Sequence, residues 1–434
     1  MSTRGAAPAV GLGEALRRGL APDGGLYVPV DIPAMAPEEW AALRGRTLPE
    51  VATALIAPLV ADAFDRPALG RLMASALSFP IPLVPVVPGT WALELFHGPT
   101  LAFKDIGART MARWLAATAG TAGDGPLTVL VATSGDTGGA VAHAFHGVAG
   151  TRVVVLYPRG RVSAVQEAQF ATLGGNVTAV AVEGTFDDCQ RLVKEAFSEP
   201  ALAARHRLTS ANSISVGRLL PQMAYYAWAV LQLPATAPPP VVVVPSGNLG
   251  NVTAGLLAAR RGVPIARFVA ATTVNDPLPR YLASGRYEPA AAVPTLANAM
   301  DVGHPSNFER LQWLFGGDVE AMRRAVVGLA VTDDEIRAAM REMDAHGYLA
   351  DPHTAVGWVG AKAAAAFAGP EVPRVVLSTA HPAKFGDVVA PVLGREVPLP
   401  PALAERMAQV PRPLSAAPHL AAVVDVLEQL TTPT

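Results

Sequence analysis

Short apolar runs rich in β-branched residues recur along the chain and constrain its fold more than any other feature. We predict strands at Leu127–Thr133, Val153–Tyr157, Val177–Val182, Val241–Val244, Phe268–Thr272 and Arg374–Ser378. Continuously apolar strands of this kind are buried on both faces. Helix-period segments lie between them, such as Asp187–Phe197 and the stretch opened by Thr332-Asp-Asp-Glu335, which has capping-box spacing. This alternation predicts parallel α/β sheets.

Length and composition limit the class of protein. A chain of 434 residues exceeds the size at which one core stops growing, so two or three domains are expected. Hydrophobic residues at 51% and charged residues at 16% predict a globular protein. The formal net charge is −2 and no basic block is present, so nucleic acid is not an expected partner.

The single cysteine and the apolar runs bear on location. Cys189 can form no intrachain disulfide, and we expect it to pack as a small apolar residue. No uninterrupted apolar run approaches the roughly 18 residues that a membrane span needs, and the N-terminus lacks signal-peptide organisation. We therefore expect an unprocessed cytoplasmic protein without a membrane partner. The sequence does not indicate an oligomeric state.

Two proline-rich passages divide the chain. Pro80–Pro88 separates a mostly helical N-terminal part from the segment around Lys104, and Pro234–Pro240 precedes a strand that three consecutive prolines could not continue. We predict an N-terminal region over 1–92, an α/β domain over 93–225 and a larger α/β domain over 226–434.

One lysine lies in a Gly/Pro turn among apolar neighbours. The segment reads His97-Gly-Pro-Thr100-Leu-Ala-Phe103-Lys104-Asp105, and a helix is expected to begin at Ile106. A partly desolvated lysine can form a Schiff base with pyridoxal phosphate or with a carbonyl substrate. A solvated lysine at a helix start is the simpler interpretation of this residue alone.

A glycine-rich loop comes directly after the strand at Val241–Val244. The segment Ser246-Gly247-Asn248-Leu249-Gly250-Asn251 leads into a predicted helix, an arrangement suited to holding a phosphate with backbone N–H groups. A plain strand-to-helix turn would give the same pattern. Neither a dinucleotide fingerprint nor a Walker lysine accompanies the loop, so a nucleotide cofactor is less favoured than pyridoxal phosphate.

Several other polar segments are candidates for a site. Ser134-Gly135-Asp136-Thr137 comes after a strand and opens a helix, so it can bind a carboxylate, although Asp136 could also simply cap that helix. Asn212, Ser213 and Arg218 together suit a phosphoryl group. His353 and His381 are candidates for proton relay or phosphate contact, or are structural. The histidines show no spacing typical of a metal site, so none is predicted.

These segments resemble, in the same order, those of threonine synthases. The pattern His97 to Asp105 is similar to the family's pyridoxal-phosphate lysine segment, and no segment alone would be specific. The other matching segments are Gly19 to Pro29, Thr133 to Gly138, Asn212 to Arg218, Ser246 to Asn251, Ala299 to Asp301 with Ser306 to Arg310, and Thr379 to Phe385. The resemblance runs from about residue 19 to about residue 387.

The resemblance implies a fold-type II pyridoxal-phosphate enzyme similar to the tryptophan synthase β subunit, with a smaller mobile domain over 93–225 and a large cofactor domain over 226–434. Lys104 is implied as the catalytic residue, which forms the Schiff base and moves the substrate's protons. Thr379 is implied as the neutral partner of the cofactor ring nitrogen, although a threonine closing a strand is common. Implied cofactor-binding residues are Lys104, Phe103, Asp136, Gly247, Asn248, Leu249, Gly250, Asn251 and Thr379.

The implied substrate is O-phospho-L-homoserine, which is converted with water to L-threonine and phosphate. Its implied binding residues are Ser134, Gly135, Thr137, Asn212, Ser213, Arg218, His381 and Lys384. Two positions depart from many relatives. Asp136 stands where many carry asparagine, and Ile214 to Gly217 replace an aromatic residue and alanine before Arg218. Without the resemblance, Arg218 would be interpreted as a solvated or salt-bridged arginine.

Three alternatives remain open from the sequence. Two are other fold-type II lyases, namely a serine/threonine dehydratase and a phospho-lyase acting on a related amino acid. The third is a non-catalytic paralogue that binds an amino acid or phosphate. Ser213 and Arg218 favour a phosphorylated substrate over a dehydratase substrate, and the presence of both Lys104 and the phosphate loop argues against the paralogue.

Overall fold

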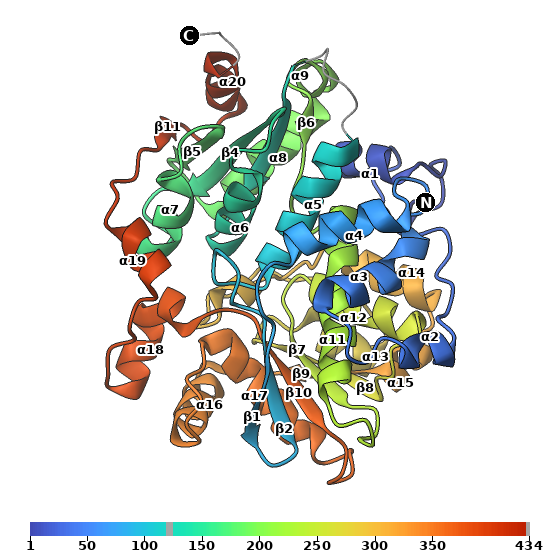
Figure 1. Cartoon of the computed structure of the whole chain (residues 1–434). Helices are drawn as coiled ribbons and strands as arrows, with labels where there is room; N and C mark the ends of the chain where they lie inside the picture. The colour runs from blue at the N-terminus through green and yellow to red at the C-terminus, as the bar shows by residue number, and fades with distance from the viewer. Residues whose placement is uncertain (119–124, 431–434) are drawn as a thin grey trace.

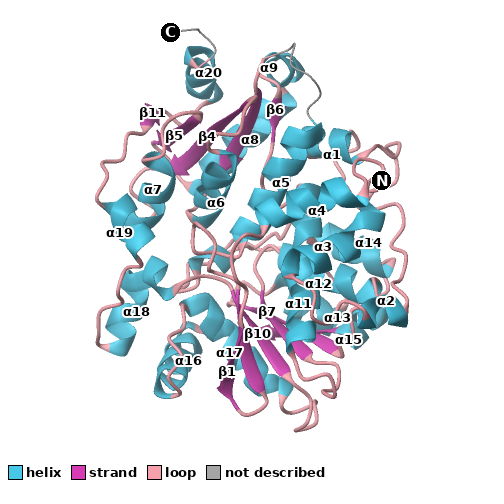
Figure 2. Cartoon of the chain, in the orientation of Figure 1, coloured by secondary structure: helices cyan, strands magenta, loops and turns pink. Residues whose placement is uncertain are grey.

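Two sheets surrounded by helices form the framework of the computed structural model, which describes residues 1–118 and 125–430 (Figure 1, Figure 2). The five-stranded sheet is parallel throughout, with the order β11 (Leu414–Ala416), β5 (Val177–Val182), β4 (Thr151–Pro158), β3 (Leu127–Ala132) and β6 (Leu208–Thr209). The six-stranded sheet has the order β1 (Leu83–Val87), β2 (Thr90–Glu94), β10 (Arg374–Ser378), β7 (Val241–Pro245), β8 (Arg267–Thr272) and β9 (Val326–Ala330). Only β1 runs antiparallel to its neighbour among these described strands. The predicted fold class is confirmed.

The six predicted strands are β3, β4, β5, β7, β8 and β10, and their ends lie within two residues of the expected ones. Every residue of β3 and of β7 is buried, as continuous apolar runs require. The pattern did not predict β1, β2, β6, β9 or β11. Apart from β2, these strands lie at sheet edges, where one side lacks a neighbouring strand and the apolar signal is weaker.

The helices follow the expected alternation. Thr332 caps the helix that it opens, because its hydroxyl accepts from the Glu335 N–H while the Glu335 carboxylate accepts from the Thr332 N–H. The α-helices are α1 (Leu12–Arg18), α2 (Pro37–Ala41), α3 (Leu48–Ile56), α4 (Arg66–Ala76), α5 (Lys104–Thr118), α6 (Asp136–Phe145), α7 (Ala164–Ala171), α8 (Phe186–Ser198), α9 (Pro200–Arg205), α10 (Val216–Leu219), α11 (Met223–Gln232), α12 (Gly250–Arg260), α13 (Pro277–Ser284), α14 (Phe308–Phe315), α15 (Val319–Ala325), α16 (Asp333–Ala345), α17 (Pro352–Ala364), α18 (Gly386–Leu393), α19 (Pro401–Met407) and α20 (Leu420–Gln429). Short 3-10 turns are η1 (Ala57–Leu59), η2 (Leu220–Gln222), η3 (Asn298–Met300) and η4 (Pro382–Phe385).

The chain crosses between the two sheets more often than the predicted boundaries imply. β1 and β2 lie within or at the end of the expected N-terminal region, yet β2 pairs with β10 of the six-stranded sheet. The C-terminal segment leaves α18 and passes through α19 to β11, which pairs with β5 at the edge of the other sheet (Figure 1). Each sheet therefore takes strands from both sides of a predicted boundary, and the boundaries themselves stay a prediction.

Buried apolar side chains surround both sheets. Cys189 on α8 is fully buried beside residues of β3, β4 and β5, which confirms its expected packing. Burial raises the pKa of its thiol to about 12. Among the helices within 1–118 and 125–430, none combines the length and apolar character needed to cross a bilayer.

Candidate functional site

The turn before Lys104 is fixed by a distant strand end. The Phe103 N–H donates to the Thr379 carbonyl over 2.8 Å, and the His381 N–H donates to the Leu101 carbonyl over 3.0 Å. Leu101 takes a left-handed φ of 57° within this turn. Helix α5 begins at Lys104 itself, two residues before the expected start. The lysine is thus held where β10 ends.

A buried carboxylate closes the same turn. Asp105 accepts from the Thr100 N–H over 2.8 Å and from the Thr100 hydroxyl over 2.7 Å, and both residues are fully buried. Burial raises the pKa of Asp105 to about 6, although the two hydrogen bonds from Thr100 oppose the shift. Asp105 therefore contributes to the shape of the turn.

Two lysines share one buried carboxylate. The Lys384 Nζ lies 2.9 Å from Asp136 Oδ1 and donates to the Thr100 carbonyl over 2.7 Å. The Lys104 Nζ lies 3.9 Å from Asp136 Oδ2. The structure thus brings together three predicted site residues from η4, α5 and α6, and Asp136 bridges the two ammonium groups.

This arrangement sets the charges of the cluster. Burial lowers the pKa of Lys104 to about 8, and the charges of Lys384 and Arg218 act in the same direction while Asp136 opposes them. Burial would raise the pKa of Asp136, but Lys384 and then Lys104 hold it well below its usual range. A lysine with a pKa near 8 is partly neutral at physiological pH, so its amine is available as a nucleophile or a base.

The loop that carries Asp136 is built around Thr133. The Thr133 hydroxyl accepts from the N–H groups of Gly135 and Gly138, which bends the chain between β3 and α6. Gly135 has a φ of 142°, and a Cβ there would lie 2.3 Å from the Gln166 side chain. Asp136 is the first residue of α6 rather than its N-cap, and its carboxylate oxygens face the two lysines. Ser134 is exposed and Thr137 is half-buried in this loop.

The glycine-rich loop between β7 and α12 leaves almost no room for side chains. A Cβ on Gly247 would lie 2.7 Å from the Met300 Cα, and a Cβ on Gly250 would lie 3.2 Å from the Asn307 amide. Leu249 occupies the left-handed region with a φ of 61°. Such a loop exposes backbone N–H groups at a helix N-terminus, where an anion is favoured.

Asn251 adds an unused donor to this loop. Its buried Oδ1 accepts from the hydroxyls of Tyr225 and Tyr226, over 2.5 and 2.6 Å. Its Nδ2 has no hydrogen-bond partner within the described part of the chain. A buried amide donor without a partner and a glycine that no side chain could replace both fit a phosphate group at this loop.

One of the predicted substrate-phosphate residues, Ser213, is bonded to that loop. The Asn248 amide donates to the Ser213 hydroxyl over 2.5 Å, and the Asn248 Oδ1 accepts from the Ser306 N–H over 2.6 Å. Arg218 is buried and donates to the Ala211 carbonyl through Nη1, while its Nε has no partner among the described residues. The Asn212 Oδ1 is likewise buried and unpaired among them. Burial lowers the pKa of Arg218 to about 10.

The remaining predicted residues have structural contacts. Thr379 is buried at the end of β10, and its carbonyl holds Phe103. His381 accepts from the Ala383 N–H at the start of η4 and packs edge-on against Phe96. Burial lowers the pKa of His381.

His353 joins two segments. Its Nδ1 lies 2.6 Å from Asp351 Oδ2, and its Nε2 accepts from the Ala299 N–H over 3.2 Å. Both ring nitrogens are therefore occupied, which favours the structural interpretation of this histidine over proton relay.

Sequence reasoning missed the residues that hold the site loops together. Arg310 is fully buried and donates to the carbonyls of Tyr27, Ser213 and Ile214. Gln166 donates to Asp136 and Gln169 to the Thr100 carbonyl. The segment containing Arg310 was recognised only as part of the family pattern, and no signal marked the two glutamines.

Metal ligands are not clustered in the described residues, since no group of three or more His, Cys, Asp or Glu side chains there could hold an ion. The polar groups of the site are instead two lysines, one carboxylate, amides and an arginine. These groups suit carbonyl and phosphate chemistry.

The sequence matches three family models along its length. The model described as "Pyridoxal-phosphate dependent enzyme" matches residues 84–379. The model described as "Threonine synthase N terminus" matches residues 1–77, and "Threonine synthase, C-terminal" matches residues 354–427.

Individual relatives cover nearly the whole chain. A threonine synthase of Escherichia coli (strain K12) is 44% identical over 399 residues, which are 92% of this chain and 91% of that protein. The crystal structure of threonine synthase from Escherichia coli covers 97% of each chain with a TM-score of 0.91 and 41% identity. The crystal structure of pyridoxal-phosphate-bound threonine synthase from Brucella melitensis covers 100% of this chain and 99% of that one, with a TM-score of 0.94 and 38% identity.

Proposed function

Because the chain belongs to the threonine synthase family, we propose that it acts on O-phospho-L-homoserine and water and that it releases L-threonine and phosphate. The protein is a pyridoxal-phosphate-dependent lyase of amino-acid biosynthesis. The substrate and the role of each residue are our proposal. The observation that carries it is the largely buried amine of Lys104, whose side chain is 16% exposed and whose pKa is about 8, beside the Asp136–Lys384 pair.

We assign the cofactor to the space between Lys104, the Ser246–Asn251 loop and Thr379. Pyridoxal phosphate, when bound, withdraws electrons from the substrate's α-carbon and stabilises negative charge there. Lys104 would hold the cofactor's carbonyl carbon, and the backbone of Gly247 and Gly250 with the Asn251 Nδ2 would hold its phosphate. We also assign Phe103, Asn248 and Leu249 to the cofactor-binding site. The Thr379 hydroxyl would face the ring nitrogen of the cofactor as a neutral partner.

Lys104 would also move the protons of the reaction. Its lowered pKa lets the amine take protons from the substrate's α- and β-carbons and return one to the α-carbon. Lys384 would keep Asp136 ionised, so that the carboxylate does not claim the proton on Lys104. The positive charge of Lys384 offsets the negative charge of Asp136. The carboxylate could therefore lie near an anionic oxygen of the cofactor ring.

The substrate would be held at both ends. We assign its phosphate to Asn212, Ser213 and Arg218. Arg218 is buried, and among the described residues no carboxylate bonds to it and its Nε has no partner. We assign its carboxylate to the loop of Ser134, Gly135 and Thr137. His381 and Lys384 border the same space.

Water must enter only after phosphate has left, and a closing domain would control that order. We propose 93–225 as the moving part, since it carries both Lys104 and the Asp136 loop. We also propose a cytoplasmic location, which the single buried cysteine favours.

The direct test is to incubate the purified, cofactor-loaded protein with O-phospho-L-homoserine and to identify both products. Stoichiometric L-threonine and phosphate are expected. Phosphate release with a keto acid instead of threonine would show a phospho-lyase, and activity only on serine or threonine would show a dehydratase.

A further inference from the structure

A surface hollow lined by cationic side chains shares no lining residue with the site described above. It has a volume of about 360 Å³ and lies between α4, α5 and α6. Its charged or titratable lining residues, taken from the described part of the chain, are Arg109, Arg113, His143 and His146. No aspartate or glutamate is among those lining residues. The hollow reaches solvent, because Ser75 and His146 at its border are exposed.

The two arginines are held in place by neutral acceptors. Arg109 donates to the carbonyls of Ser75 and Ala76 and to the Ser78 hydroxyl. Arg113 donates through Nε to the Ser75 hydroxyl and through Nη1 to the Arg109 carbonyl. None of the hydrogen bonds made among the described residues uses Nη2 of Arg113. Among the described residues, no carboxylate pairs with either guanidinium group, and neutral acceptors alone position them.

The two like charges disfavour each other. Arg109 and Arg113 are four residues apart on α5, so they project from the same side of the helix. Burial lowers the pKa of both, and the charge of Arg109 lowers that of Arg113 further. Asp105 is the acidic group that acts on Arg109, but its oxygens are bonded to Thr100. A bound anion would relieve this repulsion.

His143 contributes a hydrogen-bond acceptor to the hollow, unlike the two arginines. Burial lowers the pKa of His143 to about 4, with smaller contributions from nearby cations, so the ring is neutral at physiological pH. The ring also bonds the backbone of Gln169, and its buried Nε2 has no partner among the residues described. With one nitrogen donating to a carbonyl, the neutral imidazole presents the other as an acceptor.

The ligand of this hollow must therefore accept hydrogen bonds from guanidinium groups and donate one to an imidazole. We propose that the hollow binds a small oxyanion that carries an O–H group, namely inorganic phosphate or a phosphomonoester in its singly protonated form. Phosphate offers oxygens to Arg113 and a P–OH to His143. Sulfate at neutral pH has the oxygens but no O–H, so it satisfies only half of the site.

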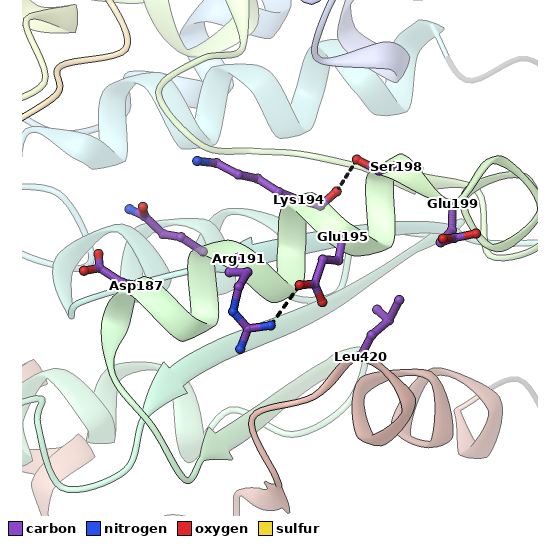
Figure 3. Close-up of a pocket in the computed structure, with 8 residues that line it drawn as sticks. Asp187, Arg191, Lys194, Glu195, Ser198, Glu199 and Leu420 are labelled. Atoms are coloured by element: carbon purple, nitrogen blue, oxygen red, sulfur yellow. Dashed lines mark hydrogen bonds and ion pairs between the residues drawn. The ribbon is translucent and has the colours of Figure 1, made fainter.

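A second surface hollow shows that cations alone do not make such a site. A groove of about 630 Å³ between α8 and the start of α20 is also lined by charged side chains (Figure 3). There Arg191 pairs with Asp188 and Glu195, and Asp187 and Glu199 add further negative charge. The acidic residues in that groove offset its cations. The lining of the hollow at Arg113, as far as the structure describes it, contains no acidic residue.

The test measures phosphate binding to the cofactor-loaded enzyme by titration calorimetry. The active site has its own proposed phosphate position, so the wild type should bind two phosphates per chain. Arg218→Ala should remove only the active-site phosphate. Arg113→Met should weaken the second one at least about tenfold, because a charge-assisted hydrogen bond is lost. Arg113→Lys should recover part of the affinity, which separates a lost charge from a damaged fold.

The matched control is Arg71→Met, which removes one exposed arginine of α4 outside the hollow. It should bind two phosphates, and turnover in Arg113→Met should stay at the wild-type level. Sulfate should bind the Arg218→Ala protein more weakly than phosphate does. In the same protein at about pH 6, where about half of a phosphomonoester keeps its P–OH, glycerol 3-phosphate binding as tightly as phosphate would favour a phosphomonoester, and weaker binding would favour the free ion.

The outcomes separate the two proposals. If Arg113→Met and Arg71→Met both bind two phosphates like the wild type, the second site is wrong. If Arg218→Ala alone abolishes all phosphate binding, the second site is also wrong. If Arg113→Met loses one phosphate and Arg218→Ala loses none, the second site stands and the proposed substrate-phosphate position fails.

Discussion

Two loops of the molecule have the same local design, but one has no ionisable side chain and the other carries a buried carboxylate paired with two lysines. Each comes after a buried parallel strand, contains glycines and opens a helix: Ser246–Asn251 joins β7 to the first residues of α12, and Ser134–Gly139 joins β3 to the first residues of α6. The first contains no ionisable side chain and is closed by the backbone at Met300. The second carries Asp136 between two lysines.

This difference in charge between the two loops indicates that the two sheets have different roles in the site. A loop of backbone N–H groups and neutral amides suits a constant anion, because its donors do not change protonation with pH. A carboxylate shared by two lysines instead sets the protonation of the groups around it. We infer that the six-stranded sheet holds the cofactor phosphate and that the loop of the five-stranded sheet controls proton movement.

Removing the lysine amine should have the largest effect. Lys104→Ala should lower turnover by at least about a hundredfold, since general acid–base catalysis alone contributes that much. The visible absorbance of cofactor bound to Lys104 should disappear while the circular dichroism of the fold is kept. Lys362→Ala, which removes a surface lysine paired with Glu342, is the control. Retention of both absorbance and turnover in Lys104→Ala would break the assignment.

The Ser246–Asn251 loop should not tolerate larger side chains at its glycines without losing cofactor. Gly247→Val places atoms against the Met300 backbone, which cannot move aside easily, so cofactor should be lost on dialysis. Gly250→Val meets only the Asn307 side chain and should lose less. Thermal stability should fall with the bound cofactor. Gly386→Ala, where a Cβ meets nothing within 4 Å, is the control. Equal cofactor retention in all three variants would contradict a phosphate-holding loop.

Arg218 tests whether the substrate carries a phosphate. Arg218→Ala should lower kcat/KM for O-phospho-L-homoserine at least about tenfold, because a charge-assisted hydrogen bond is lost. Cofactor absorbance should remain, since we assign the cofactor phosphate to another loop. Inhibition by inorganic phosphate at the active site should weaken too. Equal losses on the phosphorylated substrate and on L-serine or L-threonine would mean that Arg218 is structural.

The charged loop should show itself in the pH profile. The charge of Lys384 lowers the pKa of Lys104, and Lys384 is also the nearest cation to Asp136. Lys384→Met should therefore raise the pKa of Lys104, both by removing a repulsive charge and by leaving Asp136 to attract Lys104. The amine would then stay protonated up to a higher pH. The acidic limb of the kcat profile should therefore shift to higher pH than in the wild type. Lys362→Met should keep the wild-type profile. An unshifted pH profile in Lys384→Met would mean that the charge of Lys384 does not affect the pKa of Lys104.

Local sequence was sufficient for much of the fold. Fully apolar β-branched runs predicted the central strands, because such residues are stable only when both faces of a strand are covered. The spacing of Thr332 and Glu335 predicted a helix start, since a capping box satisfies N–H groups within one turn. The ordered motifs around Lys104, Ser246–Asn251 and Arg218 were enough to indicate the family.

The tertiary structure decided which charges meet and how they titrate. Lys384 bonds the Thr100 carbonyl 284 positions away, and Arg310 bonds the Tyr27 carbonyl 283 positions away. The strands β2 and β11 likewise took their places through pairing with distant segments. Protonation at Lys104 depends on burial and on charges brought from other strand ends. Sequence position carries no information about those distances, because burial and Coulomb energy depend on where the folded chain places each group.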